Sequence, residues 1–491
     1  MKKFICNIAI AAGVLLGVSS CDGFLDKLPT DSVVAESAMK TLADAKVVAN
    51  GLYTELKYYT MYGTYLPQMG DMRADNLYPI NSSGSGRTIY TLEYEPTQSP
   101  YFGLWTNYYT TIMRANTIIA NIGTLVVETQ EDMAVKDDIL GQAYAVRALC
   151  YFDLARLYGY PYLKDNGASL GAVILTTVVS PSESKQPRST VAQTYTQIEK
   201  DLAEALPRLS TDKNDGHFNY WAAKMLQGKV ALYKGDYSTA FSACKEVIEE
   251  SPYRLVPNSE YLAYWGKQCD DESVLELLVT NTGDIDNDGG FYTIYHDLWF
   301  DDKAAGHDII PTKKWRELFA DTPNDVRAQM IAHDDVNDGV VKTGEYWLKK
   351  FIGNKDLGYT FRRNNPRVFR ITDAYLMAAE AGIESGQQIK ANEYLNAVIQ
   401  RADPTAQDVV ATYELVQLER QKEFIGEGHR FFDVMRRGGT IVRDESIDSH
   451  DFAGNPRQVI TWDDMRVVLP ISATERIIYR ELQQNPGYKE N

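Results

Sequence analysis

The stretch QGKVALYKGDYSTAFSACKEVIEESP, residues 227–252, has the pattern of two short helices joined by a tight turn. Gly228 and Ala240 are small residues at positions where two helices can approach each other closely, and Gly235 lies between the two apolar periods. Pro252 ends the second helical segment, because proline cannot continue a helix. The stretch therefore predicts an antiparallel pair of helices packed through small side chains.

An aromatic residue after the turn, here Tyr237, completes a pattern that is typical of the tetratricopeptide repeat. A weaker copy is YLMAAEAGIESGQQIKANEYLNAVIQRADP, residues 375–404. Its matching positions are occupied by Ala379, Gly386, Ala391, Leu395 and Val398. Because the two copies are far apart in the sequence, they predict helix-pair units with insertions between them, and not a tandem array. Such units build a frame, and inserted loops supply function.

Helical spacing of apolar residues covers most of the remaining chain. It predicts helices over residues 38–58, 105–121, 138–158, 190–206 and 217–234. The region between Arg254 and Tyr359 differs, because it is rich in Gly, Asp, Asn and aromatic residues and has short β-like runs such as 273–279. Helical spacing resumes at Phe369 and continues to Arg437.

These patterns predict a mainly α fold of helix pairs with short strands in an irregular, loop-rich part. We expect one domain over residues 21–491, with a helical frame over about 35–253 and 366–439 and a loop-rich insertion over about 254–365. The 44% hydrophobic content is sufficient for a packed core.

The chain begins MKKFICNIAIAAGVLLGVSSC, with two lysines before an apolar run from Phe4 to Val18. The run is too short to span a bilayer, and its small-residue end is typical of a secretory signal peptide over residues 1–20. The final LGVSSC resembles a bacterial lipobox, in which the cysteine is acylated, so we expect Cys21 to carry a membrane anchor. The alternative is plain cleavage near Cys21, leaving a free thiol.

The charge of the chain excludes one class of partner. The formal net charge is −17, and removal of residues 1–20 would take away two lysines and no acid, giving −19. Such an acidic chain repels nucleic acid and anionic membrane surfaces. The 32 tyrosines and 7 tryptophans point in another direction, because flat aromatic faces stack on the apolar faces of sugars and pack at interfaces.

Metal ligands are sparse. After Cys21 only Cys150, Cys244 and Cys269 remain, with no spacing typical of a metal site or a disulfide framework. The segment DIDNDGG begins like a calcium loop, with acids at Asp284, Asp286 and Asp288. The twelfth position of such a loop requires glutamate and here is Tyr295, which argues against an EF-hand. An irregular calcium loop and an Asp-rich solvated turn both remain open, and no other cofactor is expected.

Candidate ligand contacts lie in two regions. In GDMRADNLYPINSSGSGRT, residues 70–88, Arg73 and Asn76 offer directed hydrogen bonds to hydroxyl groups, and Tyr78 offers a stacking face; the alternative is a packed turn with a disordered tip. The insertion adds further aromatic residues that are either core residues or ligand platforms. The candidates among them are Tyr292, Trp299, Trp315 and Trp347.

The segment ERQKEFIGEGHRFFDVMRRGG, residues 419–439, combines acids, a histidine and arginines in the manner of an active site. Helical spacing would let Glu427 bond to Arg430 and His429 bond to Asp433 along one helix, so we interpret the segment as packing. The chain contains no phosphate loop, dinucleotide fingerprint, HExxH or GxSxG motif, and we expect no enzyme. Paired carboxylates for glycoside cleavage stay open, because their separation is spatial.

Nine blocks of the sequence resemble, in order and spacing, the SusD/RagB family of nutrient-binding surface lipoproteins of Bacteroidetes. The blocks are the Cys21 lipobox with FLDKLPTDSV, GDMRADN, LWTNYYTTIMRAN, AYAVRALCYFDLARLYGYPY, STVAQTYTQIEKDLAEALPRL, AAKMLQGKVALYKGDYSTA, FRITDAYLMAAEA, ERQKEFIGEGHRFFDVMRRG and VVLPISATERIIYRELQQNPGY. The resemblance extends over nearly the whole chain.

The resemblance implies a cell-surface lipoprotein that binds oligosaccharides or polysaccharides without cleaving them and delivers them to a SusC-like TonB-dependent outer-membrane transporter. It implies an outer-membrane location, since Asp22 and Asp26 behind the lipobox resemble a surface-export signal. Only Arg73 and Asn76 carry over near the ligand region; the aromatic candidates rest on residue type and region. Two alternatives remain: a binder of peptides or another nutrient on the same fold, and a surface glycosidase.

Overall fold

The structure is a computed structural model of the 491-residue chain. It describes residues 39–79, 85–97, 101, 103–180, 182–213, 215–279, 298–300, 303–305, 309–333, 346–353, 355, 357, 364–443 and 458–489. Cys21, Tyr292 and the three acids of the calcium-like segment lie outside the described residues.

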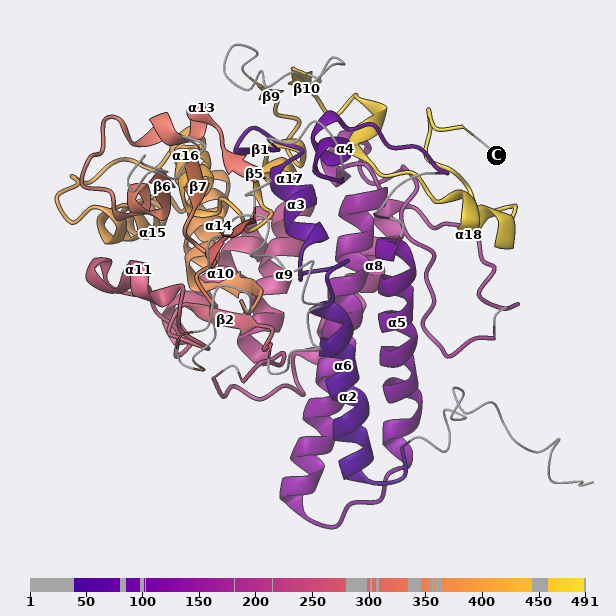
Figure 1. Ribbon diagram of the computed structural model, residues 1–491. Helices are drawn as coiled ribbons and strands as arrows, with labels where there is room; N and C mark the ends of the chain where they lie inside the picture. Colours follow the sequence, from indigo (N-terminus) through magenta and orange to yellow (C-terminus); the bar gives the residue numbers. More distant parts are fainter. Residues whose placement is uncertain are drawn as a thin grey trace, which may run out of the picture.

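A bundle of long helices forms the centre of the molecule (Figure 1). It consists of α2 (Leu42–Leu56), α5 (Gly103–Asn121), α6 (Gln130–Tyr158) and α8 (Val191–Ala205). The sequence places the end of α6 correctly, but the helix begins earlier than predicted. The reason is its cap: the Thr129 side chain accepts a hydrogen bond from the Asp132 N–H, and two acids lie in the first turn.

The stretch at residues 227–252 forms the predicted helix pair, α9 (Tyr220–Lys234) and α10 (Tyr237–Glu250). Gly235 caps α9 with φ of 83°, in the left-handed region that favours glycine. A Cβ added to Gly228 would lie 2.7 Å from the Cys244 Sγ atom. The two helices therefore approach each other at a position that only glycine fills without displacing its neighbour.

The weaker copy forms the pair α14 (Ile371–Glu384) and α15 (Gln388–Ala402), with Gly386 at φ of 76° between them. α14 packs against α10, so the two pairs lie side by side although they are distant in the sequence (Figure 1). A Cβ added to Gly382 of α14 would lie 3.2 Å from atoms of both Ala391 and Phe241. The frame is thus a stack of two helix pairs.

Shorter elements connect the bundle and the pairs. The short α-helices are α3 (Tyr65–Asp71), α4 (Ser85–Thr91), α7 (Tyr162–Asp165), α11 (Tyr261–Tyr264), α13 (Lys313–Arg316), α16 (Tyr413–Glu423), α17 (Arg430–Met435) and α18 (Ala473–Ile478). The 3₁₀ turns are η2 (Ile122–Thr124), η3 (Asn258–Glu260), η4 (Glu317–Phe319), η5 (Val326–Met330) and η6 (Met465–Val467).

The described strands are short and pair in twos, always antiparallel. The pairs are β1 (Leu77–Pro79) with β5 (Ile309–Pro311), β2 (Ser273–Glu276) with β8 (Arg367–Arg370), β3 (Leu298–Phe300) with β4 (Lys303–Ala305), β6 (Ile331–His333) with β7 (Tyr346–Leu348), and β9 (Ile441–Val442) with β10 (Val459–Ile460). The predicted mainly α fold with short strands is confirmed. Phe369, predicted to begin a helix, belongs to β8 instead, because β2 provides a partner strand.

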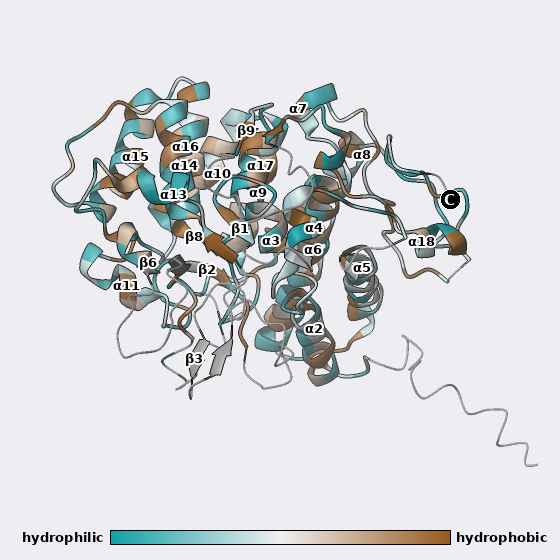
Figure 2. Ribbon diagram, turned by 45° about the horizontal axis from the view of Figure 1, so that its top comes forward, coloured by the Kyte–Doolittle hydropathy of each residue, from teal (hydrophilic) through white to brown (hydrophobic). Residues whose placement is uncertain are grey.

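Buried apolar side chains form one continuous cluster that includes residues of both the helical frame and the loop-rich region. Hydrophilic and hydrophobic residues alternate along helices such as α2 and α15 (Figure 2). In the part of the chain that the structure describes, no helix combines the length and apolar character needed to cross a membrane.

Candidate ligand-binding region

Arg73 lies in the interior and ties the 70–79 segment to the C-terminal part of the chain. Its guanidinium donates hydrogen bonds to the carbonyl oxygens of Val467 and, at 3.1 Å, of Arg466. The same group lies over the ring of Phe431, 3.8 Å from the ring centroid. Burial lowers the pKa of Arg73. The side chain is fully covered, so its role in this conformation is structural.

Asn76, Tyr78 and Trp315 are also buried. The Asn76 Oδ1 atom accepts a hydrogen bond from the Gln421 side chain at 2.9 Å, and Trp315 donates its ring N–H to the Gln421 carbonyl at 2.8 Å. Tyr78 lies in β1 opposite Ile310 of β5. In this conformation these three side chains and Arg73 do not reach a ligand at the surface. The expectation that they contact ligand is therefore not supported.

The same contacts bring the two candidate regions together. β1 pairs with β5, and β7 also contacts β5, so Tyr78 and Trp347 lie on strands that share one neighbouring strand. Trp299 lies in β3, which pairs with β4 among the described strands. The side chains of Trp299 and Trp347 lie outside what the structure describes, as does Tyr292 altogether. The aromatic platform stays a prediction at these three positions.

Asp75 joins three parts of the chain. Its carboxylate accepts hydrogen bonds from Arg430 of α17 at 2.8 Å and from Lys314 of α13 at 2.8 Å. Burial alone would raise the pKa of Asp75, but the two cations outweigh it and lower the pKa to about 2. The carboxylate is therefore ionised at neutral pH and holds the 70–79 segment between the frame and the loop-rich region.

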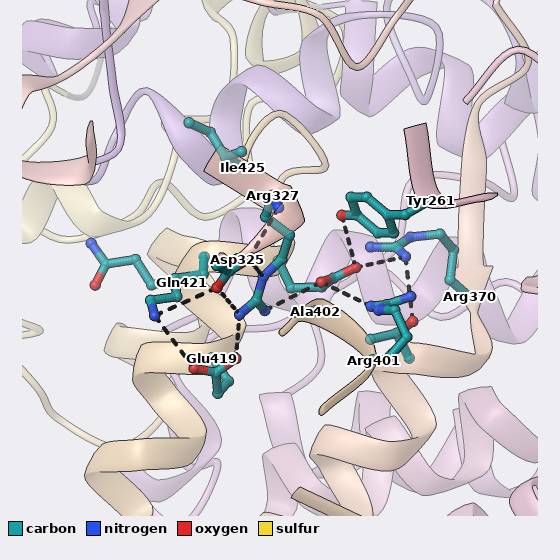
Figure 3. A network of polar contacts seen from close by, with 12 residues as sticks. Tyr261, Asp325, Arg327, Arg370, Arg401, Ala402, Glu419, Gln421 and Ile425 are labelled. Atoms are coloured by element: carbon teal, nitrogen blue, oxygen red, sulfur yellow. Dashed lines mark hydrogen bonds and ion pairs between the residues drawn. The ribbon is translucent and has the colours of Figure 1, made fainter. Parts of the chain in front are cut away.

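A buried network of charges lies beneath the loop-rich region (Figure 3). Its centre is Arg370 at the end of β8, which pairs with Glu423 at 3.0 Å and with Glu272 at 2.8 Å. Arg401 of α15 pairs with the same two carboxylates. Burial opposes the charge of Glu423, but the surrounding cations hold its pKa well below the usual range. The Tyr261 hydroxyl donates to Glu423 at 3.2 Å.

The network extends from the frame into the insertion. Arg327 of η5 pairs with Asp325 at 2.7 Å and with Glu419 of α16 at 2.6 Å. Lys350 pairs with Glu427 at 2.5 Å and donates to the Ile425 carbonyl. Because these side chains are almost fully buried, removing one partner would leave a buried charge unpaired. The ion pairs therefore join Asp325, Arg327 and Lys350 to the frame.

The segment 419–439 is packed, as interpreted from the sequence, but its predicted pairing along one helix is wrong. Gly426 and Gly428 have φ of 80° and interrupt the helix before α17. As a result Glu427 pairs with Arg370 and Lys350, whereas Arg430 pairs with Asp75. These partners come from other parts of the chain.

His429 and Asp433 do not form an exposed acid–base pair. His429 stacks on Phe424 at 4.4 Å between ring centroids, and burial together with Lys229 lowers its pKa well below the usual range. Asp433 accepts from Arg420 at 2.8 Å and is buried. No group of residues in the described ranges has the composition and geometry of a metal site.

Four tyrosines that the sequence analysis did not single out form a chain of ring contacts. Tyr58 contacts Tyr59 at 4.6 Å, Tyr59 contacts Tyr65 at 5.5 Å, and Tyr65 contacts Tyr101 at 4.8 Å, all between ring centroids. Tyr58 is 40% exposed, Tyr59 and Tyr65 are half-buried, and Tyr101 is buried behind them. The group is called the tyrosine cluster below.

The tyrosine cluster lies beside the start of the loop-rich region. Lys57, immediately before it, donates to the Leu278 carbonyl at 2.9 Å, two residues before the undescribed segment that contains Tyr292. Adjacent, partly exposed rings are suited to stacking on sugar faces. The only sequence signal was the unusual run YYTMYGTY at 58–65, which has no periodicity that separates core from surface.

Two family models match the chain. One, described as "SusD family", matches residues 311–488, and the other, described as "Starch-binding associating with outer membrane", matches residues 23–232. A putative sugar binding protein from Bacteroides vulgatus is 32% identical, with a TM-score of 0.83, covering 92% of this chain and 100% of that chain. The chain belongs to the SusD/RagB family. The predicted membership is thereby confirmed.

Other SusD-like proteins match over nearly the full length. SusD-like protein P25 of Formosa agariphila is 24% identical, over 98% of this chain and 97% of its own length. A laminarin binding SusD-like protein shares the fold, with a TM-score of 0.71 at 23% identity over 91% of this chain and 100% of that one. Two of these relatives bear names that describe sugar binding and laminarin binding. The description of the N-terminal family model mentions association with the outer membrane.

Proposed function

We propose that this SusD-like protein is a surface-exposed lipoprotein of the outer membrane, anchored through Cys21, that binds oligosaccharides or polysaccharides and does not cleave them. We propose further that it delivers them to a SusC-like TonB-dependent transporter. The observation that carries the proposal is the match, along the whole length of a solved chain, to a putative sugar binding protein. The description of the N-terminal family model as starch-binding supports the same ligand class.

We place the ligand at the junction of the tyrosine cluster with the loop-rich region. Trp299, Trp347 and Tyr292 would extend the aromatic surface there. Stacking on a few rings, with hydroxyl groups to desolvate, gives modest affinity, about micromolar or weaker. Such weak capture suits a protein that hands its ligand to a transporter.

We propose that the protein does not cleave its ligand, because the carboxylates of the 419–439 segment form ion pairs with buried cations. Glu419, Glu423 and Glu427 each pair with a buried cation and are themselves buried or nearly so. A glycosidase requires two carboxyl groups facing the scissile bond. Release of new reducing ends from any bound glycan would overturn this part.

Affinity electrophoresis tests the ligand class. Native gels containing starch, laminarin or other soluble glycans should retard the protein in at least one case, with no product released. The double variant Tyr58→Ala/Tyr65→Ala should lose retardation, whereas Tyr220→Ala, a half-buried tyrosine on α9, should keep it. Binding of peptides with no retardation by any glycan would refute the proposal.

Two further elements are proposed from the sequence. Cys21→Ala should leave folding intact and release the protein from membranes; retention after a carbonate wash would refute the lipid anchor.

A calcium ion is proposed to bind Asp284, Asp286 and Asp288, which lie close to Tyr292 in the sequence. Glycan retardation should then weaken in chelator and recover with added calcium, and an unchanged gel would remove calcium from the account.

A further inference from the structure

A groove of about 700 Å³ lies along α5, and core residues such as Trp105 and Val173 form part of its lining. Its floor is one face of α5, with Trp105, Tyr109 and Met113, and its walls are the 173–186 segment and α18. α18 lies beside the upper end of α5 in Figure 1. Nothing described so far uses this groove, which is separate from the tyrosine cluster.

The rim of the groove exposes apolar side chains. Ile478, in the last turn of α18, lines the groove and is 58% exposed, and the adjacent Ile477 is 75% exposed. Exposed apolar surface at the edge of a groove can mark an interaction site, and in α18 it is Ile478, not Ile477, that lines the groove. Val179 and Leu482 continue the apolar lining.

The described chain begins at one end of this groove. Arg114 of α5 donates to the Gly51 carbonyl at 3.0 Å, and Asn107, earlier in α5, donates to Thr60, later in the chain than Gly51, so α2 and α5 are antiparallel neighbours. Leu42, where α2 begins, lies about 13 Å from Gly51 along the helix. Met39 is therefore near the C-terminal end of α5, where Thr117 closes the groove.

The chain before Met39 is long enough to fill the groove. Residues 22–38 can extend over about 55 Å, whereas the α5 face from Trp105 to Thr117 is about 18 Å long. The match to the N-terminal family model begins at residue 23, so this segment belongs to the sequence that the family shares. A purely variable linker would not be expected to match.

The composition of the segment complements the groove. FLDKLPTDSVV, residues 24–34, alternates apolar residues such as Phe24 and Leu28 with acids. The groove is lined by the cations Arg114 and Lys185 and by Glu475; Arg114 also pairs with Glu55 of α2. Opposite charges at the rim of an apolar contact set the register of binding.

We infer that residues 24–34 of this chain bind in the groove along α5, running from the Thr117 end towards Trp105. The apolar side chains cover Met113, Tyr109 and Ile478, and the acids face the two cations. The lipid at Cys21 then leaves the domain beside α18, at the opposite end of α5 from the start of α2. The docked segment shortens the tether between membrane and domain.

A peptide suits this groove better than a sugar. Trp105 is 5% exposed and packs edge-on against Tyr158 at 4.9 Å between ring centroids, so it offers no open face for stacking. Of the apolar side chains that line the groove, Ile478 is exposed, whereas Tyr109 and Tyr479 are half-buried. Aliphatic surface favours apolar side chains over hydroxyl-rich ligands.

Disulfide trapping tests the inference in the mature chain carrying Cys21→Ala. Thr110→Cys in the groove is combined with Leu28→Cys or Thr30→Cys, and the matched control is Thr196→Cys on the exposed surface of α8. The native thiols interfere little, because burial raises the pKa of Cys150 and Cys244 and raises that of Cys269 to about 12. More than half of the groove pairs should cross-link within one chain, against under a tenth of control pairs. Equal yields would overturn the inference.

Hydrogen exchange measured by mass spectrometry gives a second, independent readout. Amides of residues 24–34 should exchange at least tenfold more slowly than in a free peptide of the same sequence. Ile478→Asp should abolish this protection, and its exposed neighbour Ile477→Asp, which does not line the groove, should leave it intact. If the amides of residues 24–34 exchange as fast as in the free peptide, the inference is wrong. It is also wrong if α5 becomes protected only when a glycan or a transporter is added.

Discussion

Small residues decide how closely helices approach each other in the helical frame, whereas buried ion pairs such as Arg327–Glu419 join the loop-rich region to that frame. The frame also contains buried ion pairs of its own, such as Arg147–Asp201. In the frame, helices approach each other at small residues, as where Gly228 meets Cys244. In the loop-rich region, the described segments are fixed by buried ion pairs, as where Arg327 and Arg370 meet Glu423. Apolar packing is spread over many contacts, whereas a buried ion pair depends on each partner being present.

The difference indicates how one frame can present varied loops. Buried ion pairs attach residues of the insertion, among them Glu272, Arg327 and Lys350, to the helical frame. Next to the tyrosine cluster, Lys57 bonds to Leu278 of the insertion, and Tyr78 lies in β1, which pairs with β5 of the insertion. We therefore expect substitutions in the network to destabilise the fold and substitutions in the aromatic residues to change binding alone.

The largest effect is expected at the centre of the network. Arg370→Met removes the cation shared by Glu272, Glu423 and Glu427 and should lower the free energy of unfolding by about 3–5 kcal/mol. Urea denaturation followed by circular dichroism measures the loss. Arg87→Ala, which breaks a partly exposed pair with Glu93, is the control and should cost under about 1 kcal/mol. If the two variants lose the same free energy of unfolding, burial does not decide how much an ion pair contributes to stability.

A smaller effect is expected where the 424–429 turn meets α3. Gly428→Ala adds a Cβ 2.5 Å from the Pro67 Cα at φ of 80°, and should cost about 2–4 kcal/mol. Gly386→Ala is a matched control, because its φ is 76° but no atom lies within 4 Å of the added Cβ. It should cost about 1–2 kcal/mol. Denaturation midpoints that coincide would contradict the close contact.

Frame packing is tested by a compensating pair. Gly228→Ala should cost about 1–3 kcal/mol, because the added methyl group overlaps the Cys244 Sγ atom. Cys244→Ala removes that atom. In the Cys244→Ala background, Gly228→Ala should therefore cost at most half as much free energy of unfolding as it does in the wild type. Additive losses in a thermodynamic cycle would mean that another contact opposes residue 228.

A pH dependence of stability is expected at Asp71. Burial raises the pKa of Asp71 to about 7, even though its carboxylate accepts from the Gly428 N–H at 2.9 Å. Between about pH 4 and 7 the folded chain therefore keeps a proton that the unfolded chain loses, and this group lowers stability as pH rises, by at most about 1.4 kcal/mol per unit. Asp71→Asn should flatten that slope in urea titrations. An unchanged slope would assign it to other groups.

Most of the frame could be predicted from the sequence, because helical periodicity and turn glycines are local signals. The helix pairs around Gly235 and Gly386 are examples. The stacking of α10 on α14 has no local signal, since the two helices are remote in the chain. The family could also be predicted, because the resemblance rests on many sequence blocks in the same order.

The site was less predictable. Arg73 and Trp315 have the residue types of ligand contacts, but their partners Val467 and Gln421 come from distant segments and enclose them. Glu427 was matched to Arg430 by helical spacing, which fails once glycine interrupts the helix. Residue type and local spacing therefore do not separate a buried polar anchor from an exposed ligand contact.

The central claim is that the frame is a scaffold and that glycan binding belongs to the tyrosine cluster and the loop-rich region. Titration calorimetry with the glycan that retards the wild type tests it directly. We predict roughly tenfold weaker binding for Tyr58→Ala/Tyr65→Ala, from about 0.5–1.5 kcal/mol per ring, and unchanged affinity for Tyr220→Ala, with native circular dichroism in both. Equal affinity of all three proteins, or equal weakening by the α9 variant, would contradict the claim.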